Sequence, residues 1–200
     1  LGHELRNPLA PIVTALQLMK LRSDGVPSRE REIIERQVHH LLRLVDALFD
    51  VSKIARGKVD LKRRMVEVAA VVAKGVEIAS PLLEQRRHHF SIELPSRGLL
   101  VEADEARLAQ VVSNLLTNAA RYTPPGGEIS LTGVVEGDEV VLRVKDSGIG
   151  IDAEMLPKIF DVFVQGTRAI DRSEGGLGIG LALVRNLVML HGGTVSVQSA

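Results

Sequence analysis

The stretch Asp104–Tyr122, DEARLAQVVSNLLTNAARY, is the most informative in the chain. Its first residue is a good helix N-cap and its apolar residues recur at helical spacing, so we predict a helix ending at about Tyr122. Asn114, Asn118 and Arg121 lie on one stripe of that helix. Two amides on a packed face need polar partners, which phosphate oxygens and a hydrated Mg²⁺ would provide. A polar helix edge at the domain surface is the alternative.

The residues around this helix have the pattern of an α+β sandwich. Asp104 follows one alternating apolar segment, and Gly137-Asp138 separates two more, which is typical of a β-hairpin. We expect helices layered on one face of a mixed sheet. The predicted strands are 59–64, 89–94, 99–103, 129–135, 140–145 and 194–198, and the further helices are 68–87, 153–160 and 178–190.

Residues before Gly57 have a different, all-α pattern. Apolar residues recur at helical spacing over 5–21 and 29–55, on either side of a turn at 23–27. The two apolar stripes are too wide to bury each other, so a second copy of the hairpin would complete a four-helix bundle as a homodimer. The sequence therefore predicts two domains, a helical hairpin over 1–57 and an α+β domain over 58–200.

The composition excludes several classes of function. The 200 residues are 45% hydrophobic and have no net charge, so nothing attracts a nucleic acid by bulk charge. The chain has no Cys, which excludes disulfides, thiolate catalysis and Cys-ligated zinc. No apolar run reaches the roughly 18 residues that span a bilayer. Because the sequence begins at Leu1 without Met and stops at Ala200 inside a strand-like run, we expect a fragment of a longer protein.

A histidine with reactive surroundings lies at the start of the chain, in LGHELRNPL over 1–9. The imidazole of His3 is mostly neutral near pH 7, so one ring nitrogen can attack phosphorus while the other holds a proton. The neighbouring Glu4 can hold that proton and orient the ring. Taken alone, such a pair is more often a histidine facing solvent beside a charged neighbour.

Two glycine-rich segments follow the central helix. Lys145–Ile151, KDSGIGI, comes directly after a predicted strand, where Asp146 can accept a hydrogen bond from an adenine amine. Gly148 and Gly150 allow the backbone to approach a flat base. Gly175–Ala182, GGLGIGLA, opens a helix whose free N–H groups attract phosphate. It does not follow a strand and lacks a Gly-Lys-Ser or Gly-Lys-Thr ending, which excludes a Rossmann turn and a P-loop. Either segment alone is weak evidence.

The order and spacing of these segments resemble the sensor histidine kinases, in which a phosphotransfer hairpin precedes a Bergerat-type ATP-binding domain. The resemblance covers the whole chain. Residues 3–9 are similar to the phosphoacceptor box and 114–122 to the asparagine box. Asp146, Gly148 and Gly150 match the first glycine box, Phe160 and Phe163 the phenylalanine box, and Gly176, Gly178 and Gly180 the second glycine box.

The resemblance implies a role for each of these positions. His3 would accept the γ-phosphoryl group of ATP, and Glu4 would steer the ring and help deprotonate it. Asn7 would orient water for dephosphorylating a response regulator, Asn118 would hold Mg²⁺ and Asp146 would bind adenine. The other ATP-binding positions would be Asn114, Arg121, Tyr122, Gly148, Gly150, Phe160, Phe163, Gly176, Leu177, Gly178, Gly180 and Leu181. Residues 164–177 are similar to the family's mobile lid.

One position separates this family from its hydrolytic relatives. Gyrase-type and chaperone-type ATPases carry a Glu four residues before the metal-binding Asn, where this chain has Asn114. An amide cannot act as a general base toward water, so direct hydrolysis of ATP should be slow. His3 is then left as the acceptor.

We therefore expect autophosphorylation of His3 from Mg-ATP, followed by transfer to an Asp of a response regulator receiver domain. The resemblance also implies a homodimer and an upstream sensor domain in the parent chain, and we expect no nucleic acid partner. The segment would be cytoplasmic, in a parent protein that is either soluble or anchored in the inner membrane and that is an ordinary or a hybrid kinase. A predominantly phosphatase enzyme and a silent dimerisation scaffold are the alternatives.

Overall fold

The computed structural model describes residues 60–162, 164 and 178–199, together with Gln17, Ile34 and Val38. The chain divides into two units, Leu1–Lys58 and Val59–Ala200, and nearly all described residues belong to the second. The predicted helical hairpin and its dimeric bundle therefore lie outside the described residues.

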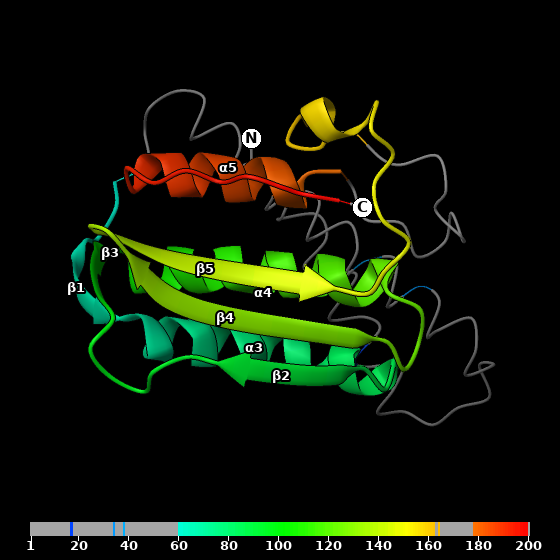
Figure 1. The fold of residues 1–200 in the computed structure, drawn as a ribbon, viewed down its shortest axis with the longest axis horizontal. Helices are drawn as coiled ribbons and strands as arrows, with labels where there is room; N and C mark the ends of the chain where they lie inside the picture. Colours follow the sequence, from blue (N-terminus) through cyan, green and yellow to red (C-terminus); the bar gives the residue numbers. More distant parts are fainter. Residues whose placement is uncertain are drawn as a thin grey trace. The chain divides into compact units, whose positions relative to one another are not determined.

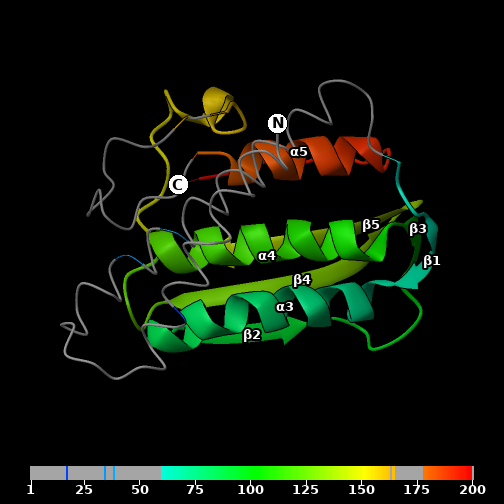
Figure 2. The ribbon, with the colours of Figure 1, turned by 180° about the vertical axis from the view of Figure 1, so that it is seen from behind.

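The second unit is an α+β domain, as predicted (Figure 1). Its three-stranded sheet has the order β2-β4-β5, in which β2 and β4 are parallel and β4 and β5 antiparallel, and β1 pairs separately with β3. The helices lie side by side when seen from behind (Figure 2). The elements are β1 (Arg64–Glu67), α3 (Val68–Gln85), β2 (His89–Glu93), β3 (Leu100–Ala103), α4 (Glu105–Tyr122), β4 (Glu128–Glu136), β5 (Glu139–Asp146), the 3₁₀ turn η1 (Leu156–Lys158) and α5 (Gly180–Leu190).

The core lies between the sheet and the helices α3 and α4. Ile129 and Leu131 alternate along β4 and are 1% and 0% exposed, and they belong to one apolar cluster with Leu116 of α4. Burying a side chain of this size contributes roughly 1.5–3 kcal/mol. A Cβ on Gly75 of α3 would lie 2.6 Å from the Cβ of Val112, so α3 approaches α4 closely at a residue that has no side chain. This packing fixes α4 against the sheet.

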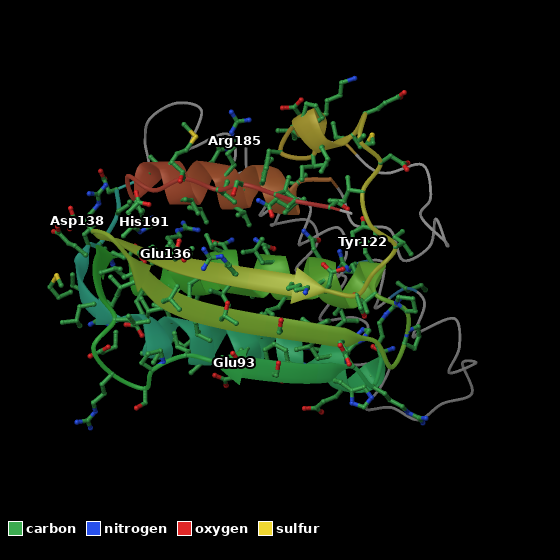
Figure 3. All side chains as sticks on the ribbon, in the orientation of Figure 1. Glu93, Tyr122, Glu136, Asp138, Arg185 and His191 are labelled. Atoms are coloured by element: carbon green, nitrogen blue, oxygen red, sulfur yellow. The ribbon has the colours of Figure 1, made fainter. Side chains whose placement is uncertain are left out.

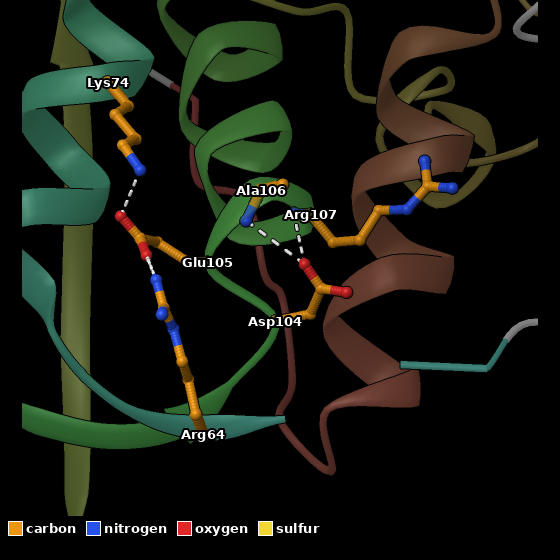
Figure 4. Close-up of polar contacts among 6 residues, drawn as sticks. All are labelled: Arg64, Lys74, Asp104, Glu105, Ala106 and Arg107. Carbon is orange, nitrogen blue, oxygen red and sulfur yellow. Dashed lines mark hydrogen bonds and ion pairs between the residues drawn. The ribbon is translucent and has the colours of Figure 1, made fainter. Parts of the chain in front are cut away.

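The N-terminus of α4 is capped as the sequence predicts. Asp104 Oδ1 accepts hydrogen bonds from the N–H groups of Ala106 (3.1 Å) and Arg107 (3.2 Å), and its other oxygen accepts from Lys62 N (3.1 Å). The next residue, Glu105, forms ion pairs with Arg64 and Lys74, as Figure 4 shows. Both cations are exposed, so these ion pairs orient the helix end more than they stabilise it.

Both carboxyls in this cluster have a lowered pKa. Partial burial acts to raise the pKa of Asp104, but the N–H groups of Lys62, Arg107 and Ala106 together outweigh it. Hydrogen bonds from Lys74 and Arg64 lower the pKa of Glu105. Each carboxylate is therefore favoured in its ionised form by the folded state.

The C-terminus of α5 is attached to this capped end of α4. The Nδ1–H of His191 donates to Leu187 O (2.8 Å), which leaves Nε2 to accept from the N–H of Asp104 (3.0 Å). Arg63 donates to Leu190 O (2.5 Å). Helix α5 therefore ends where α4 begins, and the two helices run antiparallel.

Helix α3 ends in a Schellman motif. His88 N donates to Leu83 O (3.0 Å) and Arg87 N donates to Glu84 O (2.9 Å). Arg87 has a φ of 54°, the left-handed conformation that glycine usually supplies at this position. A residue with a Cβ pays about 1–2 kcal/mol there, so the contacts that the turn makes must offset this cost.

Three of the predicted elements differ from the structure. The predicted strand 194–198 is wrong, because its backbone pairs with no described strand, although the alternation of exposed and half-buried residues persists. The strand predicted over 59–64 begins only at Arg64, where pairing with β3 buries Val66. The helix predicted over 153–160 is reduced to the turn η1, which contains Pro157.

The described residues include no helix that is both long and apolar enough to cross a bilayer.

The cap at Asp104 should make stability depend on pH. Asp104→Asn keeps an N-cap acceptor but does not titrate. Because the folded pKa of Asp104 is lowered, its ionised form stabilises the fold above the unfolded pKa, and this contribution is lost as pH falls through the folded value. Near neutral pH we expect the free energy of unfolding of the parent, measured in urea, to exceed that of the variant by less than about 1 kcal/mol. In strong acid the difference should vanish. A difference that persists in strong acid would contradict this.

Candidate functional site

Two amide side chains of α4 face the beginning of α5. Asn114 and Asn118 are half-buried. A Cβ on Gly180, the first residue of α5, would lie 3.7 Å from Asn114 Oδ1 and 3.9 Å from Asn118 Nδ2. The two amides therefore lie close to the first residue of α5.

The N-cap residue of α5 makes no side-chain capping hydrogen bond. This residue is Ile179, which is 2% exposed, and the first turn of the helix contains no acidic residue. Gly178 precedes it with a φ of +66°, a conformation that suits glycine. The first N–H groups of a helix have no partner within the helix and carry a partial positive charge, so this end of α5 attracts an anion.

The C-terminal end of α4 supports the loop that follows β5. Tyr122 O accepts a hydrogen bond from Ile149 N (3.1 Å), and Asp146 Oδ1 accepts one from Gly148 N (2.9 Å). A Cβ on Gly148 would lie 2.6 Å from Tyr122 O and 2.5 Å from Asp146 Oδ1, so no side chain fits there. Asp146 is itself exposed, which leaves its carboxylate open to a ligand.

Ser147 fixes the start of this loop to β4. Its N–H donates to Glu128 O (3.0 Å), and its Oγ accepts from Glu128 N (2.9 Å). The loop is thus held from β4 on one side and from the last turn of α4 on the other. Tyr122 lies at this end of α4, and His191 lies at the opposite end (Figure 3).

The arrangement suits a ligand with an anionic end and a flat polar end. The anion would lie at the N-terminus of α5 beside Asn114 and Asn118, and the flat group beside Asp146 and Gly148. Among the described residues, no group of three His, Cys, Asp or Glu side chains can hold a metal ion. A cation here would need oxygen donors from an amide such as Asn118 and from the ligand itself.

The structure places six of the eleven predicted positions that it describes in two groups of three. Asn114 and Asn118 lie beside Gly180, and Tyr122 lies beside the loop that contains Asp146 and Gly148. The remaining described positions are Arg121, exposed on α4; Gly150, with a φ of +69°; Phe160, half-buried after η1; Gly178, before α5; and Leu181, half-buried in its first turn. The predicted residues His3, Glu4, Asn7, Phe163, Gly176 and Leu177 lie outside the described residues, as does most of the predicted lid.

Sequence reasoning missed two groups that build the loop. Ser147 pairs with Glu128 through its hydroxyl, and a Ser after a strand-ending Asp is a weak signal for such a role. Ile149 contributes only its backbone N–H to Tyr122 O, so no residue type could have indicated the contact.

Two known families match the chain. Residues 1–57 match the family described as "His Kinase A (phospho-acceptor) domain". Residues 103–200 match the family described as "Histidine kinase-, DNA gyrase B-, and HSP90-like ATPase".

Curated relatives match over almost the whole chain. The circadian input-output histidine kinase CikA of Synechococcus elongatus is 33% identical over 206 residues, which cover 100% of this chain and 27% of CikA. The alginate biosynthesis sensor protein KinB of Pseudomonas aeruginosa is 31% identical over 202 residues, covering 99% of this chain and 33% of KinB. The chain thus spans a third or less of the length of these relatives.

Two solved structures are similar to the chain over almost its whole length. Full-length ShkA in complex with AMPPNP has a TM-score of 0.79 and 25% identity, over 99% of this chain and 42% of ShkA. The histidine kinase AdeS of Acinetobacter baumannii has a TM-score of 0.67 and 25% identity, over 94% of this chain and 86% of AdeS.

The close packing at Gly148 can be tested by adding one methyl group. Gly148→Ala should lower the free energy of unfolding by about 1–3 kcal/mol, because the new Cβ would overlap Tyr122 O and Asp146 Oδ1. Urea unfolding followed by circular dichroism measures the change. Lys145→Ala, at an exposed position of β5, is the control and should stay within about 0.5 kcal/mol of the parent. Equal stability of Gly148→Ala and the parent would show that the loop is not wedged against α4.

Proposed function

The chain belongs to the sensor histidine kinases, and on that premise we propose that it binds ATP and transfers the γ-phosphoryl group to His3. The observation that supports this most strongly is the approach of Asn114 and Asn118 to Gly180 at the uncapped start of α5. Half-buried amides at a helix N-terminus that lacks an acidic residue are suited to a polyphosphate.

The phosphate chain would lie at the end of α5. The N–H groups that follow Gly178 would donate to phosphate oxygens, and Arg121 would add a positive charge from α4. Asn118 would hold Mg²⁺ through the oxygen of its half-buried amide, together with phosphate oxygens of the nucleotide. When bound, Mg²⁺ neutralises charge on the phosphate oxygens. Phosphoryl transfer depends mainly on such positioning and charge stabilisation.

The adenine would lie against the loop after β5. The exposed carboxylate of Asp146 would accept a hydrogen bond from the adenine amine, while the oxygen that accepts from Gly148 N keeps the side chain oriented. Gly148 would allow the base to approach the backbone, as would Gly150. Tyr122 and Phe160 would line the same part of the site.

His3 would be the acceptor of the phosphoryl group. One neutral ring nitrogen would attack the γ-phosphorus, forming an N–P bond as the bond to the leaving oxygen of ADP breaks, and Glu4 would take the proton from the other nitrogen. Asn114 supports this direction of transfer, because an amide cannot activate water for hydrolysis.

The wider function would be two-component signalling. The phosphoryl group would pass from His3 to an Asp of a response regulator receiver domain, and Asn7, four residues after His3 in the sequence, would orient water for dephosphorylating the regulator. The 1–57 hairpin would dimerise, and the 58–200 domain would bind ATP. A sensor domain in the parent chain would supply the signal to this cytoplasmic segment, in a soluble or membrane-anchored protein.

The acceptor can be identified by labelling. Purified protein incubated with γ-labelled ATP and Mg²⁺ should gain acid-labile, base-stable label, because phosphohistidine hydrolyses in acid. The label should be absent from His3→Gln and from Asn118→Ala, measured on filters after acid and base treatment. His39→Gln, which changes another histidine of the first unit, should retain the label.

The two variants distinguish loss of the phosphoryl acceptor from loss of ATP binding. His3→Gln should still bind Mg-ATP and gain thermal stability from it, whereas Asn118→Ala should gain much less. Acid-stable label, or label that persists in His3→Gln, would overturn the proposal. Failure of Mg-ATP to raise the melting temperature of the parent protein would favour a silent scaffold.

A further inference from the structure

The last four carbonyls of α4 all have hydrogen-bond partners, three of them from segments distant in sequence. A helix leaves its final four C=O groups without partners of its own, so each must be satisfied by another group. Each of the four in α4 has a different donor: Ala119 O accepts from Thr123 N (3.0 Å), Ala120 O from His88 Nε2 (2.9 Å), Arg121 O from Arg86 Nη1 (3.4 Å) and Tyr122 O from Ile149 N (3.1 Å).

Two of these donors come from the single turn that ends α3. Arg86 and His88 lie on either side of Arg87, whose left-handed backbone is unfavourable for a residue with a side chain. The strained residue therefore lies between two side chains that reach the same helix end. Strain of this kind persists where the surrounding contacts hold the backbone in place.

The His88 ring has one protein partner among the described residues. A carbonyl can only accept, so the bond to Ala120 O requires the proton on Nε2. Its Nδ1 is buried without a hydrogen-bond partner in the described part of the chain. The polar contact of this half-buried ring is thus directed to the C-terminus of α4.

The same turn also reaches the base-binding loop through β4. Arg86 O accepts from Gly126 N (2.9 Å), and His89 N donates to Gly127 O (3.0 Å), which fixes the residues immediately before β4. The next residue, Glu128, is the one that pairs with Ser147. Two routes, one through α4 and one through the start of β4, therefore connect the Arg86–His89 turn to the loop.

From these contacts we infer that His88, assisted by Arg86, is a positioning residue for adenine recognition. It fixes the last turn of α4. Tyr122 O in that turn accepts from Ile149 N, and this bond sets the position of the loop and hence of the Asp146 carboxylate. His88 does not touch the nucleotide and acts through α4. This inference rests on the proposed ATP-binding function.

The test compares the preference for adenine in matched variants. His88→Ala removes the donor to Ala120 O, so the Asp146 loop should shift and the Kd for Mg-ATP should rise by about three- to tenfold. The Kd for Mg-GTP should change less, because GTP lacks the adenine amine. The ratio of the Kd for Mg-GTP to the Kd for Mg-ATP, measured by titration calorimetry, should therefore fall. His88→Gln, whose amide can donate to the same carbonyl, should recover much of the ratio.

Control variants separate positioning from general stability. His89→Ala changes the adjacent exposed histidine and should keep the parent ratio. A His88→Ala protein that has a lower melting temperature but keeps the parent ratio would overturn the inference, because the ring would then be only structural. If His88→Ala does not fold, Arg86→Ala provides the same comparison. A parent protein that binds neither nucleotide would refute the proposed function itself, which is a distinct result.

Discussion

The structure depends on α4. The free N–H groups at its start and the free carbonyls at its end need hydrogen-bond partners, and its middle carries two amide side chains. Asp104 caps the first turn, and donors from Thr123, the Arg86–His89 turn and the loop after β5 satisfy the last carbonyls. Because Leu116 and its apolar neighbours are buried against the sheet, the helix cannot rotate to expose Asn114 and Asn118. The amides must therefore find partners at the interface with α5, and that interface is the proposed phosphate site.

The antiparallel course of α5 connects the two ends of the domain. Its C-terminus is held by His191 and Arg63, next to the capped start of α4, and its uncapped N-terminus faces the amides. Charged groups have different roles at the start of α4 and at the start of α5. Ion pairs of Glu105 with exposed cations orient the first end of α4, whereas the anion-attracting end of α5 lacks an acidic residue that would compete with a ligand.

The sequence predicted several locally encoded features. The Asp104 cap, the hairpin at Gly137 and the glycine at the start of α5 depend on near neighbours, and all three are confirmed. The strand over 194–198 failed because pairing requires a second strand that periodicity cannot identify. The contacts of Ile149 and His88 could not be predicted, because they join a backbone atom or a ring to a carbonyl distant in sequence.

Hydrogen exchange with and without Mg-ATP tests most directly whether α4 joins the two ends of one nucleotide site. We expect ATP to slow exchange at the amides of Gly180 and Leu181 and, at the same time, at those of Gly148 and Ile149. Exchange in the paired strands β1 and β3, beyond the capped end of α4, should not change. If ATP binds and protects only one of the two segments, or protects β1 and β3 instead, the account of α4 as the common support of the site is contradicted.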